Sequence, residues 1–181
     1  MERIVGAFWT MLGELPYDEL KITALARRAR VSPNTLYYHF DGMADIASAA
    51  LEQAIDPRFA QQILLGGADE FPFGEAEREK FSRIALFAQS GSARLVEMLS
   101  ELLRGFWLDY LGLTDSDLNE GQARDLRFAL GGALAVLGDR SLSRDPAAIA
   151  EFFTRPLGAG VAATLRALER HGRSTLSEDS K

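Results

Sequence analysis

Apolar residues recur along the chain at the three-and-four spacing of amphipathic helices, and no stretch shows the sustained alternation of a β-strand. The pattern therefore predicts an all-α protein. In the first part of the chain it predicts four helices, over residues 4–15, 22–29, 32–40 and 44–55. The Asp56-Pro57 step ends the fourth helix, because proline disfavours the α region in the residue before it. We expect an N-terminal unit over residues 1–56.

The remaining pattern is also helical and predicts a second unit over residues 57–171. Asp145-Pro146 is a strong helix start, with an acidic cap before a proline at the first position. Asp115 or Ser116 is the expected cap of the helix before it. We expect about nine helices in all, the later five over residues 59–65, 75–89, 92–111, 118–138 and 145–171. The polar segment 172–181 is predicted to be a disordered tail.

Composition narrows the classes of protein. Of the 181 residues, 47% are apolar, which is enough for a real core, and no apolar run approaches the roughly 20 residues that span a bilayer. The chain has no cysteine, which excludes disulfides, thiolate zinc sites and cysteine nucleophiles. The N-terminus lacks the pattern of a secretory signal. We expect a cytoplasmic protein without a membrane segment.

The net charge of −6 argues against a protein that coats nucleic acid non-specifically. The distribution of charge along the chain is more informative. Residues 21–40 hold four basic side chains and no acid, in a chain with 26 acids. A basic face on an acidic protein suits docking on phosphates. On charge alone, an ordinary solvated helix face explains the pattern equally well.

The same window has the arrangement of a helix-turn-helix, in which the second helix enters a DNA major groove. Ala26 is small enough for two helices to cross closely, and residues 29–31 supply a short turn that Val31 can plug. Ser32 and Pro33 suit the cap and first position of the second helix. Leu36 and Phe40 face inward, which leaves four side chains outward, those of Asn34, Thr35, Tyr38 and His39.

The segment resembles the TetR family of bacterial transcription regulators. The matching positions are Leu25-Ala26, Ala29, Val31-Ser32 and the string Thr35-Leu36-Tyr37-Tyr38-His39-Phe40. The resemblance implies that Thr35 and its neighbours contact base edges, and that Tyr37 and His39 contact phosphates. The complete set of expected DNA-binding residues is Lys21, Arg27, Arg28, Ser32, Pro33, Asn34, Thr35, Tyr37, Tyr38 and His39.

Three positions depart from the family pattern. Arg30 replaces the turn glycine, so the turn needs either a left-handed residue or a different shape. Met43 stands where the family has a phosphate-binding lysine, and Asp41 just before it repels phosphate. These departures keep an alternative open, in which a TetR-like protein with weakened DNA binding serves as a ligand-binding or protein-interaction module.

For the second unit, the resemblance implies a homodimer joined by the last two helices and a small-molecule effector held between the middle helices. Both terminal helices contain segments that are apolar nearly all round, over residues 130–137 and 157–163. The expected dimer residues are Leu130, Ala133, Leu134, Leu137, Val161 and Leu165, although a core within one chain explains the same pattern. The expected ligand-binding residues are Phe87, Arg94, Phe106, Trp107 and Tyr110.

Nothing in the sequence indicates an enzyme. The two histidines, His39 and His171, are far apart, and no HExxH, GxSxG, GxGxxG or P-loop pattern is present. We expect no catalytic residues, metal or cofactor. The sequence predicts a regulator, most simply a repressor, that binds a palindromic operator in double-stranded DNA as a homodimer and is released by a small apolar effector.

Overall fold

The computed structural model describes residues 1–58, 60, 61, 74–141, 151 and 155–178. These residues form eight α-helices and two short 3-10 helices and contain no strand. The predicted all-α class is confirmed. The short helix predicted at 59–65 and the start predicted at Asp145-Pro146 fall largely outside the described residues.

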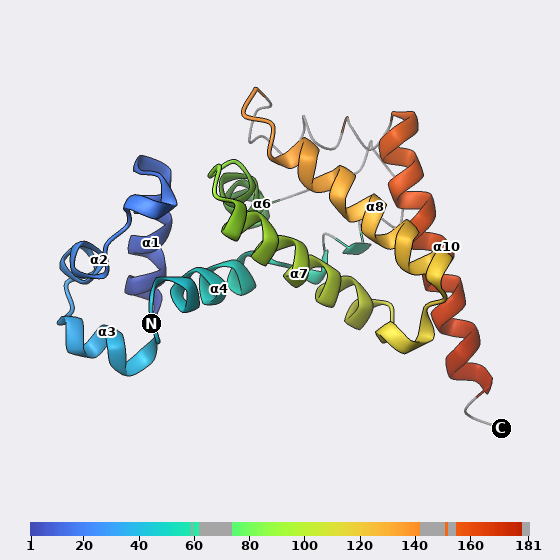
Figure 1. The fold of residues 1–181 in the computed structure, drawn as a ribbon, viewed down its shortest axis with the longest axis horizontal. Coiled ribbons are helices and arrows are strands. Elements are labelled where there is room, and N and C mark those ends of the chain that lie inside the picture. The colour runs from blue at the N-terminus through green and yellow to red at the C-terminus, as the bar shows by residue number, and fades with distance from the viewer. Residues whose placement is uncertain (59, 62–73, 142–150, 152–154, 179–181) are drawn as a thin grey trace.

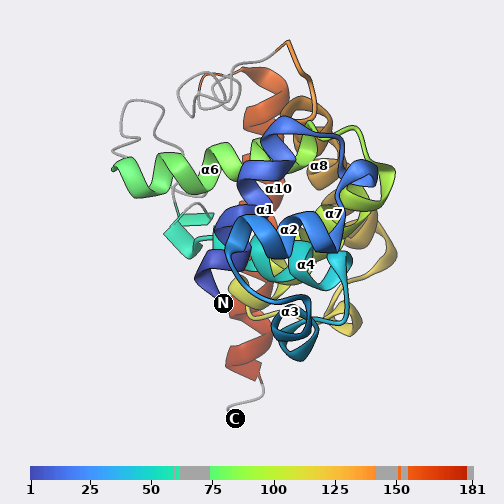
Figure 2. The same cartoon turned by 90° about the vertical axis from the view of Figure 1, so that its left-hand side faces the viewer.

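The N-terminal unit occupies one end of the molecule (Figure 1). Its helices are α1 (Glu2–Glu14), the 3-10 helix η1 (Tyr17–Glu19), α2 (Ile22–Ala29), α3 (Pro33–His39) and α4 (Met43–Ala54). Each contributes buried side chains to one centre, among them Phe8, Leu25, Leu36 and Ile46. α3 lies at the outer edge of this unit, away from the rest of the chain (Figure 1, Figure 2).

The other described helices are α6 (Glu75–Ala88), α7 (Ala93–Tyr110), η2 (Asp115–Asp117), α8 (Glu120–Leu137) and α10 (Pro156–Glu178). The expected caps at Asp115 or Ser116 are wrong, because those residues lie within η2. Asn119 caps α8 instead, accepting a hydrogen bond from the backbone N–H of Gln122. α10 starts at a proline and continues past the predicted end at residue 171.

Two buried clusters hold these helices together. The first contains the N-terminal unit together with Ile84 and Phe87 of α6, Leu95 and Leu99 of α7, and Leu134 of α8. The second joins the end of α7 to α8 and α10, and includes Trp107, Leu126 and Leu165. Because the first cluster crosses from one unit into the other, a shift of α6 or α7 must disturb the packing behind α4.

An ion cluster joins the end of α4 to α6. Asp56 is buried, and its carboxylate accepts hydrogen bonds from the Arg58 guanidinium at 2.7 and 3.0 Å and from the Lys80 ammonium at 2.9 Å. Arg58 also pairs with Glu77. The hydrogen bonds from Arg58, and less so those from Lys80, hold the pKa of Asp56 far below its usual range.

Candidate nucleic-acid interface

α2 and α3 form a helix-turn-helix whose corner is filled by small and apolar side chains. Ala26 and Ala29 of α2 are 1% and 3% exposed, and Val31 packs against the same core. The backbone N–H of Val31 donates to the carbonyl of Ala26 at 3.0 Å, which closes the end of α2. Because Ala26 has only a methyl group, α2 and α3 can cross closely at this corner, as the sequence predicts.

Arg30 makes the turn in a left-handed conformation, with φ 56° and ψ 45°. It is the only non-glycine residue with a positive φ among the described residues. Of the two possibilities that the sequence left open, the turn is thus the left-handed one, with a side chain tolerated in it. The cost of that conformation is about 1 kcal/mol relative to glycine.

The N-terminus of α3 is built as the sequence predicted. The Ser32 hydroxyl oxygen accepts a hydrogen bond from the Thr35 backbone N–H at 3.0 Å, and Pro33 is in the first turn. The Ser32 and Thr35 hydroxyl oxygens are also 2.8 Å apart, within hydrogen-bonding distance. These bonds fix the first turn of α3, where a helix that enters a major groove presents its base-contacting side chains.

Only one side of α3 is buried. Leu36 is 0% and Phe40 is 4% exposed, and both anchor the helix in the core. Every residue expected to contact DNA on α3 or at its cap is exposed, namely Ser32, Pro33, Asn34, Thr35, Tyr37, Tyr38 and His39. Tyr38 is 85% exposed, and its ring contacts that of His39 edge-on at a centroid distance of 5.1 Å. The result is a surface of aromatic side chains with polar tips.

The basic residues beside this surface are not equivalent. Arg28 is held by Glu14 at the end of α1, with two hydrogen bonds of 2.5 and 2.6 Å. The bond from Arg28 lowers the pKa of Glu14. Lys21, Arg27 and Arg30 are exposed, and their side chains form no hydrogen bond or ion pair within the described part of the chain. The positive charge available to phosphates therefore comes mainly from these three.

The start of α4 is acidic rather than basic. The Asp45 carboxylate accepts a hydrogen bond from the Asp41 backbone N–H at 3.0 Å, and Asp41 itself is exposed. Gly42, the cap residue, provides no side-chain hydrogen bond to the helix, and Met43 is half-buried. The two acids make the side of this helix start that carries them a weak site for a DNA phosphate.

The residues expected to bind a ligand are not gathered in one place. Phe87 is fully buried in the first cluster, where it contacts Trp9 edge-on. Phe106, Trp107 and Tyr110 contact one another at the end of α7, around the second cluster. Arg94, in the first turn of α7, lines a separate cavity beside α4.

The residues expected at a dimer interface divide into two kinds. Leu130, Leu134 and Leu165 are at most 7% exposed and pack within their own chain, while Ala133, Leu137 and Val161 are half-buried. From residue 128 to the end of α8, the exposed positions are instead their neighbours Phe128, Gly131, Gly132 and Ala135. Sequence periodicity could not select between these sets, because α8 and the start of α10 are apolar nearly all round.

Two residues near these surfaces were not singled out by the sequence analysis. Tyr17 lies in η1 outside the motif, and Glu14 is 14 positions away from its partner Arg28. Neither position belongs to a pattern that indicates its role. Among the described residues no group of His, Asp or Glu could hold a metal ion. No described helix is long and apolar enough to cross a membrane.

Comparisons with known proteins agree with this geometry at the N-terminus. A comparison with curated proteins gives no match. A solved structure of a candidate transcriptional regulator from Streptomyces coelicolor A3(2) is 21% identical over 94% of this chain and 96% of that chain. Its TM-score of 0.37 is too low for the likeness to support an argument. Residues 4–50, from α1 into α4, match the model of bacterial regulatory proteins of the tetR family. Over these residues, the N-terminal unit is similar to the bacterial regulatory proteins of the tetR family.

Proposed function

We propose that the chain is a cytoplasmic repressor that binds a palindromic operator as a homodimer and leaves it when a small apolar effector binds. The observation that carries the DNA-binding part is the exposed side of α3. Thr35, Tyr37 and His39 all face solvent there, on a helix whose opposite side is anchored by Leu36 and Phe40. Such a helix can enter a major groove without disturbing its own core.

An exposed apolar side of α8 supports the homodimer. Phe128 is 81% exposed, and Gly131, Gly132 and Ala135 continue the same side of the helix at a spacing of three and four residues. Leu157, in the first turn of the neighbouring helix α10, is 76% exposed. Apolar surface of this kind marks an interaction site. A twofold axis through it would pair each α8 with its own copy.

The position of α4 supports control by an effector. α4 packs against α1 on one side and against α6 and α7 on the other. A molecule that moves α6 or α7 therefore biases α4 and, through it, the spacing of the two α3 helices, which must be about 34–36 Å to read successive turns of DNA. Effector and operator are then coupled through one two-state element.

A gel shift on the DNA that adjoins the gene tests the proposal. We expect the native chain to retard this DNA at low salt and Tyr37→Ala to do so much more weakly. Tyr110→Ala, a change of the same kind far from α3, is the matched control and should bind as the native chain does. The affinity should fall steeply with salt, because phosphate contacts release counterions. Absence of a shift at low salt would contradict DNA binding.

A second function is favoured by the charges around the helix-turn-helix. Arg28 is held by Glu14, and Asp41 and Asp45 flank the start of α4. A chain with few available cations fits a module that binds a ligand or a protein rather than DNA. In that case the dimer would form in solution, and no DNA fragment, whatever its sequence, would be retarded at low salt.

A further inference from the structure

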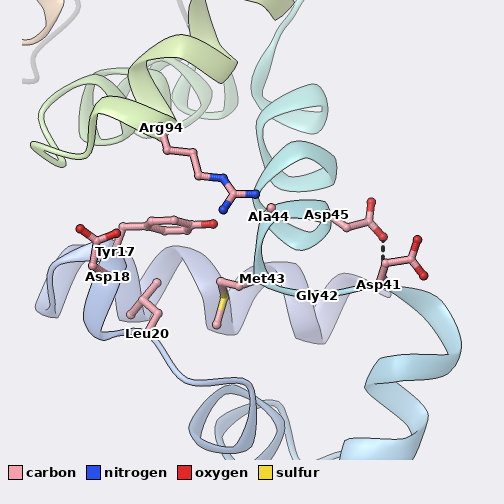
Figure 3. Close-up of a pocket in the computed structure, with 9 residues that line it drawn as sticks. All are labelled: Tyr17, Asp18, Leu20, Asp41, Gly42, Met43, Ala44, Asp45 and Arg94. Atoms are coloured by element: carbon pink, nitrogen blue, oxygen red, sulfur yellow. Dashed lines mark hydrogen bonds between the residues drawn. The ribbon is translucent and has the colours of Figure 1, made fainter.

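A pocket of about 510 Å³ lies where the N-terminal unit meets α7. We name it the junction pocket. η1 forms one wall, the start of α4 forms another, and the side chain of Arg94 reaches in from the first turn of α7 (Figure 3). Its volume is within the range of pockets that hold small molecules. It is separate from the Phe106, Trp107 and Tyr110 cluster at the other end of α7.

Two polar side chains in the junction pocket have donors that no hydrogen bond uses. The Arg94 guanidinium and the Tyr17 hydroxyl form no hydrogen bond or ion pair within the described residues. Tyr17 is only 7% exposed, yet its hydroxyl points toward the space between Arg94 and the start of α4 (Figure 3). Burial is the main influence on the Tyr17 pKa and raises it, so the hydroxyl stays protonated at neutral pH and can donate.

The start of α4 adds further donors. The first N–H groups of any α-helix have no partner within the helix, and the helix dipole makes them attract anions. In α4 no cap side chain occupies them, since the cap residue is Gly42. An anion placed between Arg94 and α4 would thus meet a guanidinium, a phenol and backbone donors together.

The acids of the junction pocket lie at its ends rather than at its centre. The Asp18 carboxylate is beyond Tyr17 at one end, and those of Asp41 and Asp45 are at the other (Figure 3). These three charges oppose an ion with two or more negative charges. Between them, Leu20 and Met43 line an apolar floor below Arg94. The centre therefore suits one negative charge attached to an apolar body.

We propose that the junction pocket binds a small monocarboxylate with an apolar body. The carboxylate accepts hydrogen bonds from Arg94, from Tyr17 and from the first turn of α4, and the apolar body lies on Leu20 and Met43. Such a ligand touches α7 and the N-terminal unit at once, so its binding fixes their relative position. As a route for effector control of DNA, this inference rests on the proposed function, whereas the binding itself does not.

Benzoate is a suitable probe, and the full-length chain labelled with ¹³C in its methionine methyl groups reports on it by NMR. The chain has four methionines. Met43 lines the junction pocket, and Met11 lies in the buried core as an internal control for folding. We expect the Met43 signal to shift saturably with benzoate and not with benzamide, which has the same ring and no charge.

Substitutions distinguish the contributions of the Arg94 and Tyr17 hydrogen-bond donors to benzoate binding. Arg94→Gln should weaken benzoate binding about tenfold or more, because hydrogen bonds between charged groups are the stronger kind. Tyr17→Phe should weaken it about two- to tenfold by removing one neutral donor. Arg124→Gln removes an equal charge from the exposed surface of α8 and should change nothing. Met11 signals like those of the native chain show that each variant is folded.

Several outcomes would overturn the proposal. They are an unresponsive Met43 signal at ~10 mM benzoate, an equal response to benzamide or to inorganic phosphate, and an unchanged response in Arg94→Gln. A gel shift with and without benzoate tests the proposed function separately. If Met43 responds but no DNA is retarded, the pocket stands and the DNA-binding proposal fails. If DNA is retarded and the Met43 signal does not respond, the DNA-binding proposal stands and the pocket proposal fails.

Discussion

The exposed side of α3 and the exposed side of α8 both carry large rings, and the rings differ in what they can bind. Tyr37 and Tyr38 on α3 are 58% and 85% exposed, and each ends in a hydroxyl. Phe128 on α8 is 81% exposed and offers only hydrocarbon, with glycines beside it. A ring with a polar tip can stay in water and still meet a phosphate, whereas a bare ring gains most by leaving water.

The surroundings of the two sides extend the contrast. Beside α3 lie the unpaired cations Lys21, Arg27 and Arg30, which suit a polyanion. Around Phe128, small residues at Gly131, Gly132 and Ala135 allow a second helix to come close. Exposed aromatic residues therefore predict different partners according to their tips and neighbours.

The largest effect is expected from Phe128→Asp on self-association. Burying a phenylalanine contributes about 1.5–3 kcal/mol, and a symmetric dimer buries two, so the dissociation constant should rise about 100-fold or more. Sedimentation equilibrium measures it. Phe128→Leu, which keeps an apolar side chain, is the control and should remain a dimer. An Asp variant that associates as tightly as the native chain would show that this side of α8 is not the interface.

The next largest effect is expected from Tyr37→Phe on DNA binding. The change removes one hydroxyl and leaves the ring, so it deletes a hydrogen bond to a charged phosphate at each half-site. Such bonds contribute about 1.5–3 kcal/mol, and the affinity for the adjoining DNA should fall about tenfold or more. Titration by fluorescence anisotropy at fixed salt measures the loss. Tyr110→Phe is the matched control, and an equal loss in both variants would remove α3 from the interface.

The exposed side of α3 could be predicted from the sequence, because the residues that determine it are close together in the chain. The cap at Ser32, the proline after it and the spacing of Leu36 and Phe40 lie within nine residues of one another, and the structure places each as expected. The left-handed turn at Arg30 was one of two expected outcomes. The Arg28 and Glu14 pair was not predicted, since its partners meet only when α2 packs against α1.

The second unit was less predictable because its pattern is uniform. Leu130 and Phe128 are both apolar positions on α8, yet one is 5% and the other 81% exposed. Which side of such a helix faces its own chain depends on where α7 and α10 pack. The hydrophobic periodicity of α8 does not determine that packing. For the same reason Phe87 and Trp107 were grouped in one expected pocket, although they lie in two clusters.

Asp56→Asn should act on the connection between the two units and on neither exposed side. The buried carboxylate loses its charge while Arg58 and Lys80 remain, and both are partly exposed, so a loss of about 1–2 kcal/mol in the free energy of unfolding is expected. Chemical denaturation measures it. Dimerisation of the folded variant should be unchanged. A variant as stable as the native chain would mean that the ion cluster contributes nothing net.

The same residue gives a dependence on pH. Because the folded chain holds the pKa of Asp56 below its ordinary value of 3.8, this contribution is complete above that value and is lost as the pH falls below it. The native chain should therefore lose more stability than Asp56→Asn between pH 5 and pH 3. Parallel curves for the two chains would contradict the lowered pKa.

A gain in stability of about 1 kcal/mol is expected from Arg30→Gly, because glycine adopts the left-handed conformation without the cost imposed by a Cβ atom. Arg30→Ala keeps the Cβ atom and loses the same charge, so it should show no comparable gain. Urea denaturation of both variants separates the backbone effect from the charge. If Ala stabilises as much as Gly, the gain comes from removing the guanidinium. Since the turn lies far from α8, neither change should alter dimerisation.

The smallest effect is expected from Glu14→Gln, which releases Arg28 from its ion pair. Both partners are well exposed, so stability should change little. Arg28 then becomes available to a phosphate, and the affinity for DNA should rise about two- to threefold, whereas dimerisation should not change. Glu19→Gln removes an equal negative charge from η1 without releasing an arginine, and it corrects for the general effect of charge. The gain must also vanish in the double variant that carries Arg28→Gln, because only a free guanidinium can produce it. Equal gains in Glu14→Gln and Glu19→Gln would mean that Arg28 does not reach the DNA, which leaves Lys21, Arg27 and Arg30 as the cations beside α3.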